Sequence, residues 1–152
     1  MYTNANPILA DGDATRAFDY VLGKTALPSN CPLGTACKVT GGGYIFVDAQ
    51  QDKGSFSLEM KVDTTGRIHG KAAYRDPAGG VDFRTSLITS ATFNGKTVTF
   101  KGTGTNNNIA TSFTITVQDK AEPGAGKDTF AITLGTGYSK ADTLQGGNIQ
   151  VH

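Results

Sequence analysis

Residues 56–62 read FSLEMKV, with apolar side chains alternating strictly with polar ones. Side chains of a β-strand point to opposite faces in turn, so this period of two predicts a strand with one dry face and one wet face. The same alternation returns later in the chain, at residues 68–74, 81–87, 98–100, 113–117, 130–134 and 149–151. We therefore expect an all-β fold of about eight short strands joined as an antiparallel meander.

The turns between these segments refine the expectation. Asn94-Gly95 predicts a type I′ hairpin, because both central residues of that turn need positive φ. Side-chain parity slips at Leu87-Ile88, which predicts a β-bulge. Because every strand has one apolar face, the sheet must curl into a barrel or fold over as a sandwich, and the pattern is the same in both. Strands do not alternate with helices, which excludes Rossmann-type nucleotide binding.

The length of 152 residues suggests one domain, in two unequal parts. Residues 40–152 carry the strand pattern and form a β-rich domain. Residues 1–39 are irregular, apart from one short helix that Asp13 can cap, that continues with helical spacing over residues 14–22 and that Gly23 can end.

Composition and charge exclude several classes of protein. Hydrophobic residues make up 38% and charged residues 18%, which is too ordinary for a disordered chain. A net charge of +1 lacks the basic surface of a dedicated nucleic-acid binder or a polybasic membrane anchor. The sequence contains no run of about 18 apolar residues, so a membrane-spanning helix is not expected. Residues 1–13 lack the pattern of an export signal, which by itself does not assign the protein to the cytosol.

The two cysteines of the chain, Cys31 and Cys37, flank a short segment that contains Pro32. In an oxidising compartment they would close a small disulfide loop worth about 2 kcal/mol. Two free thiols, or half of a zinc site, are the alternatives. Zinc would need further ligands, and the histidines are His69 and His152. Such a disulfide is typical of the secreted or cell-surface location that we expect for this protein.

Several motifs, in this order and spacing, resemble a known family. They are TGGGYI at residues 40–45, GSFSL at 54–58, GKAAYRD at 70–76, VDF at 81–83, ITS at 88–90, GTGT at 102–105, EPG at 122–124, DTF at 128–130 and GGNIQVH at 146–152. Together they resemble the post-COAP-type domain of secreted bacterial proteins over residues 40–152. The resemblance implies an exported accessory module with no established activity and no catalytic residues to transfer.

No catalytic residue is assigned. His69 is the histidine inside the expected fold, and parity places it on the wet face of a strand without a paired nucleophile. The nucleophile motif Gly-x-Ser-x-Gly is absent. Most acidic residues lie in turns and Glu59 faces solvent, so a pair of catalytic carboxylates is not expected.

Three tyrosines, Tyr44, Tyr74 and Tyr138, lie beside glycine-rich turns. Exposed aromatic rings can stack on sugars, so these residues are candidates for carbohydrate binding. The alternative is that each ring covers the rim of the core with its hydroxyl in water.

Asp119, Glu122 and Asp128 share one glycine-rich loop. Carboxylate and carbonyl oxygens are the ligands of calcium, so the loop is a candidate calcium site. The alternative is a hydrophilic turn that closes a hairpin, because the loop has no fixed ligand spacing.

These observations favour a non-enzymatic extracellular module that attaches to a surface or assembles a larger secreted structure, with a protein or polysaccharide as its partner. One alternative is a carbohydrate-binding module that uses the tyrosines. Another is a small β-barrel enzyme, such as a cyclase, which would need an internal cavity. Exposed strand edges could also mediate self-association, unless the N-terminal segment covers them.

Overall fold

The computed structural model describes residues 29–32 and 34–152, so the helix expected at residues 14–22 lies outside the described part of the chain. The described residues form one antiparallel sheet of nine strands. In chain order the strands are β1 (Cys37–Phe46), β2 (Lys53–Val62), β3 (Ile68–Asp76), β4 (Val81–Asn94), β5 (Thr97–Asn106), β6 (Ile109–Gln118), β7 (Thr129–Leu134), β8 (Ser139–Thr143) and β9 (Gly146–Val151).

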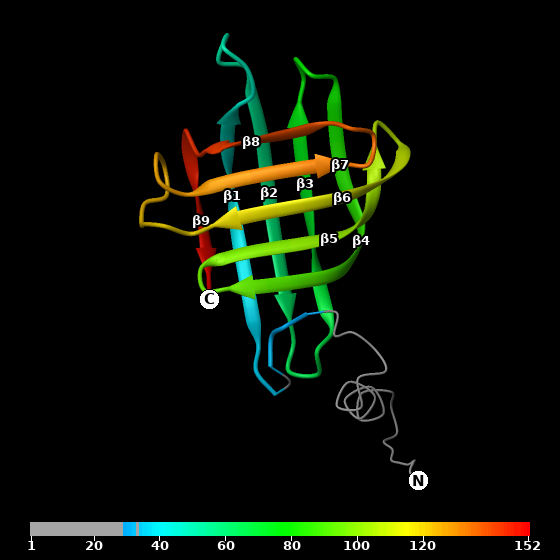
Figure 1. Cartoon of the computed structure of the whole chain (residues 1–152), viewed down its shortest axis with the longest axis vertical. Coiled ribbons are helices and arrows are strands. Elements are labelled where there is room, and N and C mark those ends of the chain that lie inside the picture. Colours follow the sequence, from blue (N-terminus) through cyan, green and yellow to red (C-terminus); the bar gives the residue numbers. More distant parts are fainter. Residues whose placement is uncertain (1–28, 33) are drawn as a thin grey trace.

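Consecutive strands pair from β1 to β8, and β9 then returns to pair with the free side of β1. The sheet curls into a half-barrel in which β1–β3 run nearly perpendicular to β5–β8 (Figure 1). We call β9, β1, β2, β3 and the start of β4 the first half, and the end of β4 with β5–β8 the second half.

Strand β4 belongs to both halves because it bends. Its register against β5 shifts between Thr85 and Leu87 and again between Ile88 and Ser90. The bulge expected near Leu87-Ile88 is therefore confirmed, as two irregularities at Ser86 and Thr89 that flank this pair. Bulges bend a strand and increase its twist, which is how one strand can turn the corner between two crossed parts of a sheet.

The apolar faces of both halves meet in one core. The ring of Phe130 in β7 stacks on Phe56 in β2, with centroids 4.1 Å apart, and lies 5.6 Å from the ring of Tyr74 in β3. Phe83 and Phe113 make a second aromatic contact between the halves at 5.3 Å. In β2 every second residue is buried, as the alternation of residues 56–62 predicts. The shared interior thus holds the crossed halves together.

One strand and one turn differ from the sequence-based expectation. Strand β8 reads SKADT and buries no apolar side chain, so it leaves no period-two signal. The hairpin at Asn94 is not type I′: Asn94 pairs with Thr97, and of the two turn residues only Gly95 has positive φ, at 61°. That pattern matches type II′. Positive φ at two successive residues occurs instead at Asn107 and Asn108.

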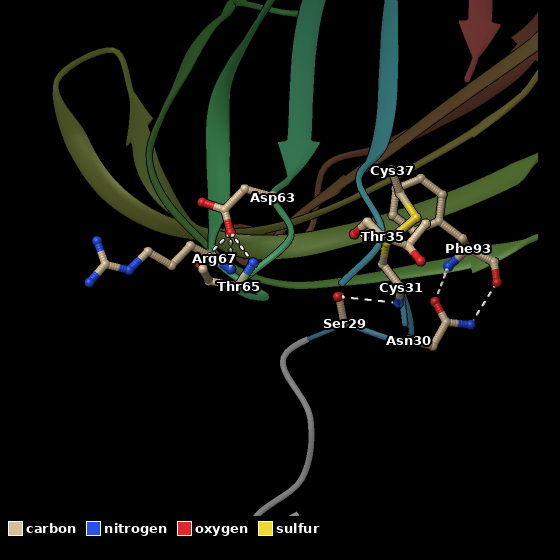
Figure 2. The surroundings of a disulfide bond; sticks show 9 residues. All are labelled: Ser29, Asn30, Cys31, Thr35, Cys37, Asp63, Thr65, Arg67 and Phe93. Atoms are coloured by element: carbon tan, nitrogen blue, oxygen red, sulfur yellow. Dashed lines mark hydrogen bonds between the residues drawn. A yellow bond between two sulfur atoms is a disulfide. The ribbon is translucent and has the colours of Figure 1, made fainter. Parts of the chain in front are cut away.

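The segment before β1 covers an open edge of β4. Pairing between β3 and β4 ends at Arg84, which leaves the rest of that edge of β4 without β3. Ser29 forms a bridge with Ala91, and the Asn30 amide both accepts from the Phe93 N–H and donates to the Phe93 carbonyl, each at 2.6 Å (Figure 2). The N-terminal segment therefore covers an edge of this molecule.

A disulfide between Cys31 and Cys37 fastens this covering segment to the first residue of β1. The expected pairing is thus present in the structure. The disulfide links the two halves indirectly, because Cys37 belongs to the first half and Asn30 is bonded to the second. It is also compatible with an extracellular location.

Candidate binding surface

The loop proposed for calcium instead holds strand β9. On the side of β9 away from β1, the Ile149 N–H donates to Asp128 Oδ2 at 2.8 Å and the Val151 N–H donates to Asp119 Oδ2 at 3.0 Å. The backbone N–H groups of Lys120 and Ala121 donate to Asp128 Oδ1 at 2.7 and 3.2 Å. Carboxylates take the place of a neighbouring strand along this edge.

Glu122 completes the attachment from the same loop. Its Oε1 accepts from Asn148 Nδ2 at 2.8 Å and from Gln150 Nε2 at 3.2 Å. Within residues 29–32 and 34–152, no three His, Cys, Asp or Glu side chains come together as a metal site. The calcium hypothesis stays a prediction. One oxygen each of Asp119, Glu122 and Asp128 is engaged by β9, and the second oxygen of Asp128 accepts from the backbone of the loop.

Tyr74 and Tyr138 form one cluster with the buried Asp76. The Tyr138 hydroxyl donates to Asp76 Oδ2 at 2.6 Å, and the two tyrosine oxygens are 2.7 Å apart. Burial raises the pKa of Tyr74 to about 12. Burial, together with the hydrogen bond to Asp76, raises the pKa of Tyr138 strongly. Both hydroxyls therefore stay protonated and connect β3 to the turn before β8.

The three candidate tyrosines therefore differ in how far they are exposed to a ligand. The Tyr74 ring is buried, so the expectation that it is displayed for a ligand is wrong. Tyr44 lies half-buried on the outer face of β1, with the Phe46 ring 6.1 Å away and the Lys53 ammonium 4.4 Å above its own ring. Its ring packs over Gly146, where a Cβ would come within 2.5 Å of the Tyr44 Cε1. Of the three, Tyr44 is the one on the outer surface of the sheet.

Around Tyr44, the outer face of the first half carries three rows of side chains that cross the strands. The middle row has small side chains and ends at an arginine: Gly42, Ser57, Ala73 and Arg84. The row on one side is Tyr44, Ser55, Arg75 and Asp82. The row on the other side is Thr40, Glu59 and Lys71. Small residues between larger ones leave a channel perpendicular to the strands.

The channel consists of two adjoining hollows, with volumes of about 600 and 280 Å³. Both hollows are lined by Ser57, Ala73 and Arg84. We call the channel formed by the three rows the cross-strand groove. Because neighbouring strands lie about 4.8 Å apart, it extends roughly 14 Å from β1 to β4.

Positive charges outnumber negative charges on one side of the groove. Lys71 lies 4.0 Å from Glu59, and because both side chains are exposed this pair contributes little to stability. The guanidinium groups of Arg75 and Arg84 make no ion pair within 4 Å to any residue from 29 onward that the structure describes. Asp82 lies on the strand beside Arg75. The Arg75 side of the groove thus has two cations and one anion.

The outer face of the second half has a different character. A hollow of about 310 Å³ lies on it between β4 and β7. Most of the polar side chains that line it carry hydroxyl groups: Thr89, Thr103, Ser112, Thr114 and Thr133. Lys101 is the single cation in that lining.

His69 lies on the solvent face, as expected. Its Nε2 is 2.8 Å from Asp63 Oδ2, in the turn that joins β2 to β3. Hydrogen bonds from the Thr65 side chain and from His69 hold the pKa of Asp63 well below its usual range. These hydrogen bonds order the turn. Within the described residues, no serine, threonine or cysteine side chain forms a hydrogen bond with the His69 imidazole.

Comparisons with known proteins leave the chain without an assigned relative: no family model, curated protein or solved structure matches it. No helix in the described residues is long and apolar enough to cross a membrane.

Of the residues that form the groove, the sequence singled out only Tyr44 as a candidate for binding. Parity places Ser57, Arg75 and Arg84 on outer faces, but only the register of β2, β3 and β4 makes them neighbours. A signal was present in the small outward residues Gly42 and Ala73, which stand where larger polar side chains are usual.

Proposed function

We propose that this chain is a non-enzymatic extracellular attachment module, and that it binds polysaccharide through the cross-strand groove. The observation that carries the proposal is the pair of adjoining hollows on the outer face of the first half. A polysaccharide is an extended chain, and an open channel that crosses several strands can contact consecutive sugar units along it.

The lining of the groove suits such a ligand. Thr40, Ser55 and Ser57 offer hydroxyl groups for hydrogen bonds, and the half-buried Tyr44, paired with Ser55, offers an aromatic ring beside the hollows. All of these residues project from paired strands rather than from loops. A surface that is already rigid loses little conformational entropy when it binds, which favours binding by a shallow site.

Three further points support an extracellular accessory role over an enzymatic one. The Cys31–Cys37 disulfide is compatible with an oxidising compartment. The resemblance of residues 40–152 to post-COAP-type domains implies an exported accessory module. Aromatic rings fill the centre of the half-barrel, where a small barrel enzyme such as a cyclase would need space for its substrate.

Affinity electrophoresis tests the proposal, with a panel of soluble polysaccharides cast in the gel: xylan, dextran, methyl-esterified and unesterified polygalacturonate, and alginate. We expect at least one to retard the protein. Ser57→Gln, which fills the floor of the groove without changing charge, should abolish the retardation.

Ser112→Gln is the matched control, because it places the same side chain in the hollow of the second half. It should leave the retardation unchanged. Absence of retardation by every polysaccharide, or equal loss in both variants, would contradict the proposal.

A further inference from the structure

We infer that the cross-strand groove selects polysaccharides that carry anionic groups, and that Arg75 and Arg84 are the residues that recognise those groups. This inference rests on the proposed function and specifies the chemistry of the ligand.

The two arginines lie together at the β3–β4 side of the groove. Arg75 pairs with Asp82, and Arg84 pairs with Ala73, so the arginines occupy diagonal positions on adjacent strands. Diagonal neighbours on one face of a sheet have side chains within reach of a common ligand. Both arginines line the 280 Å³ hollow together with Ser55 and Ser57.

The chemistry of this hollow suits an oxyanion. A guanidinium group presents a planar fork of N–H donors that matches a carboxylate, sulfate or phosphate group. Serine hydroxyls beside the fork can donate to the same oxyanion or bind the adjacent sugar hydroxyls. Both side chains are exposed and lack an ion-pair partner among residues 29–32 and 34–152, so a ligand displaces no carboxylate of this part of the chain from them.

One of the remaining charges in the groove opposes an anionic chain, and the two arginines outnumber it. Glu59 is offset by Lys71, which leaves Asp82 as the carboxylate beside the two arginines. Lys53 lines neither hollow; it lies over the Tyr44 ring and adds a positive charge to the same outer face. A charged chain that extends from the groove to Tyr44 would therefore meet a further cation.

Isothermal titration with matched polymers tests this inference. Polygalacturonate is compared with its methyl ester, and dextran sulfate with dextran; a poly(glycerol phosphate) serves as the phosphodiester arm. We expect binding to at least one anionic polymer and at least about tenfold weaker binding to its neutral counterpart, because the neutral polymer cannot form charge-assisted hydrogen bonds with the guanidinium groups. The affinity should also fall as salt is raised.

Variants assign the effect to the arginines. Arg75→Ala/Arg84→Ala should weaken anionic binding at least about tenfold, and Arg75→Lys/Arg84→Lys should weaken it less, because lysine keeps the charge and loses the fork. Lys101→Ala/Lys127→Ala removes the same charge from other parts of the surface and should have little effect. Equal weakening by both alanine pairs would overturn the inference in favour of a non-specific charge effect.

The outcomes separate this inference from the proposed function. If neutral and anionic polymers bind equally and Ser57→Gln abolishes both, the groove binds polysaccharide and the selection for anions is refuted. If no polymer binds, the proposed function itself fails.

Discussion

The two halves of the half-barrel share one interior but differ on their outer faces. On the inside, Phe56 of the first half stacks on Phe130 of the second, and both strands alternate in the same way. On the outside, the first half places small residues between larger charged ones, whereas the second half is dominated by threonines of similar size. Packing in the core restricts the side chains on both inner faces in the same way. The side chains on the outer faces are free to differ, so differences there indicate function.

The largest expected effect comes from breaking the interior that the halves share. Phe130→Ala removes the ring that contacts both Phe56 and Tyr74, and we expect a loss of about 3–5 kcal/mol in the free energy of unfolding. Urea denaturation followed by circular dichroism measures it. Thr114→Ala, on the outer face of the second half, should change stability by less than about 0.5 kcal/mol. A similar result for both variants would contradict a shared core.

Releasing β9 should affect the first half more than the second. Asp128→Ala leaves the N–H groups of Lys120, Ala121 and Ile149 without their acceptor, at a cost of roughly 2–4 kcal/mol. Hydrogen exchange should show earlier loss of protection in β9 than in β5 and β6. The control is Asp142→Asn, at an exposed carboxylate that accepts only from the neighbouring Thr143 N–H. Uniform loss of protection across the sheet would count against a local attachment.

The disulfide connects the halves at the edge of β4. Cys31→Ser/Cys37→Ser should cost about 2 kcal/mol, because the short loop is no longer closed in the unfolded chain. The Phe93 amide, which donates to Asn30, should lose hydrogen-exchange protection first. Mass spectrometry should show a gain of two hydrogens when the wild-type protein is reduced. Unchanged mass, or unchanged protection at Phe93, would contradict this role.

The tyrosine cluster joins the halves at the other end and gives the smallest effect, visible at high pH. The pKa of Tyr74 is raised from 10.0 to about 12, so the folded protein holds this proton more tightly than the unfolded chain does. The resulting stability is fully present below pH 10 and is lost as pH rises towards 12. The free energy of unfolding of Tyr74→Phe should therefore fall less steeply between pH 9.5 and 11.5 than that of the wild type. If the free energies of unfolding of the wild type and of Tyr74→Phe change in parallel with pH, the pKa of Tyr74 is not raised.

Much of the fold could be predicted because burial leaves a periodic pattern in the sequence. The alternation at residues 56–62 and the bulge at Leu87-Ile88 were both readable. Strand β8 was not, because an edge strand without buried apolar residues has no period to detect. Tyr74 could have been placed inside, since it shares parity with the apolar Ala72.

The groove and the attachment of β9 could not be predicted in the same way. Arg75 and Arg84 become neighbours only through the register of β3 and β4. Asp128 finds Ile149 only because β9 returns to β1 instead of pairing with β8. Both depend on contacts between residues distant in sequence, which neither periodicity nor local motifs encode.

NMR titration of the ¹⁵N-labelled protein with an oligomer of a polymer that binds would show whether the first half carries the binding face. We expect amide shift changes at Gly42, Ser57, Ala73 and Arg84, with none at Thr99, Thr114 or Thr133. Shift changes confined to the threonine-rich second half would contradict it.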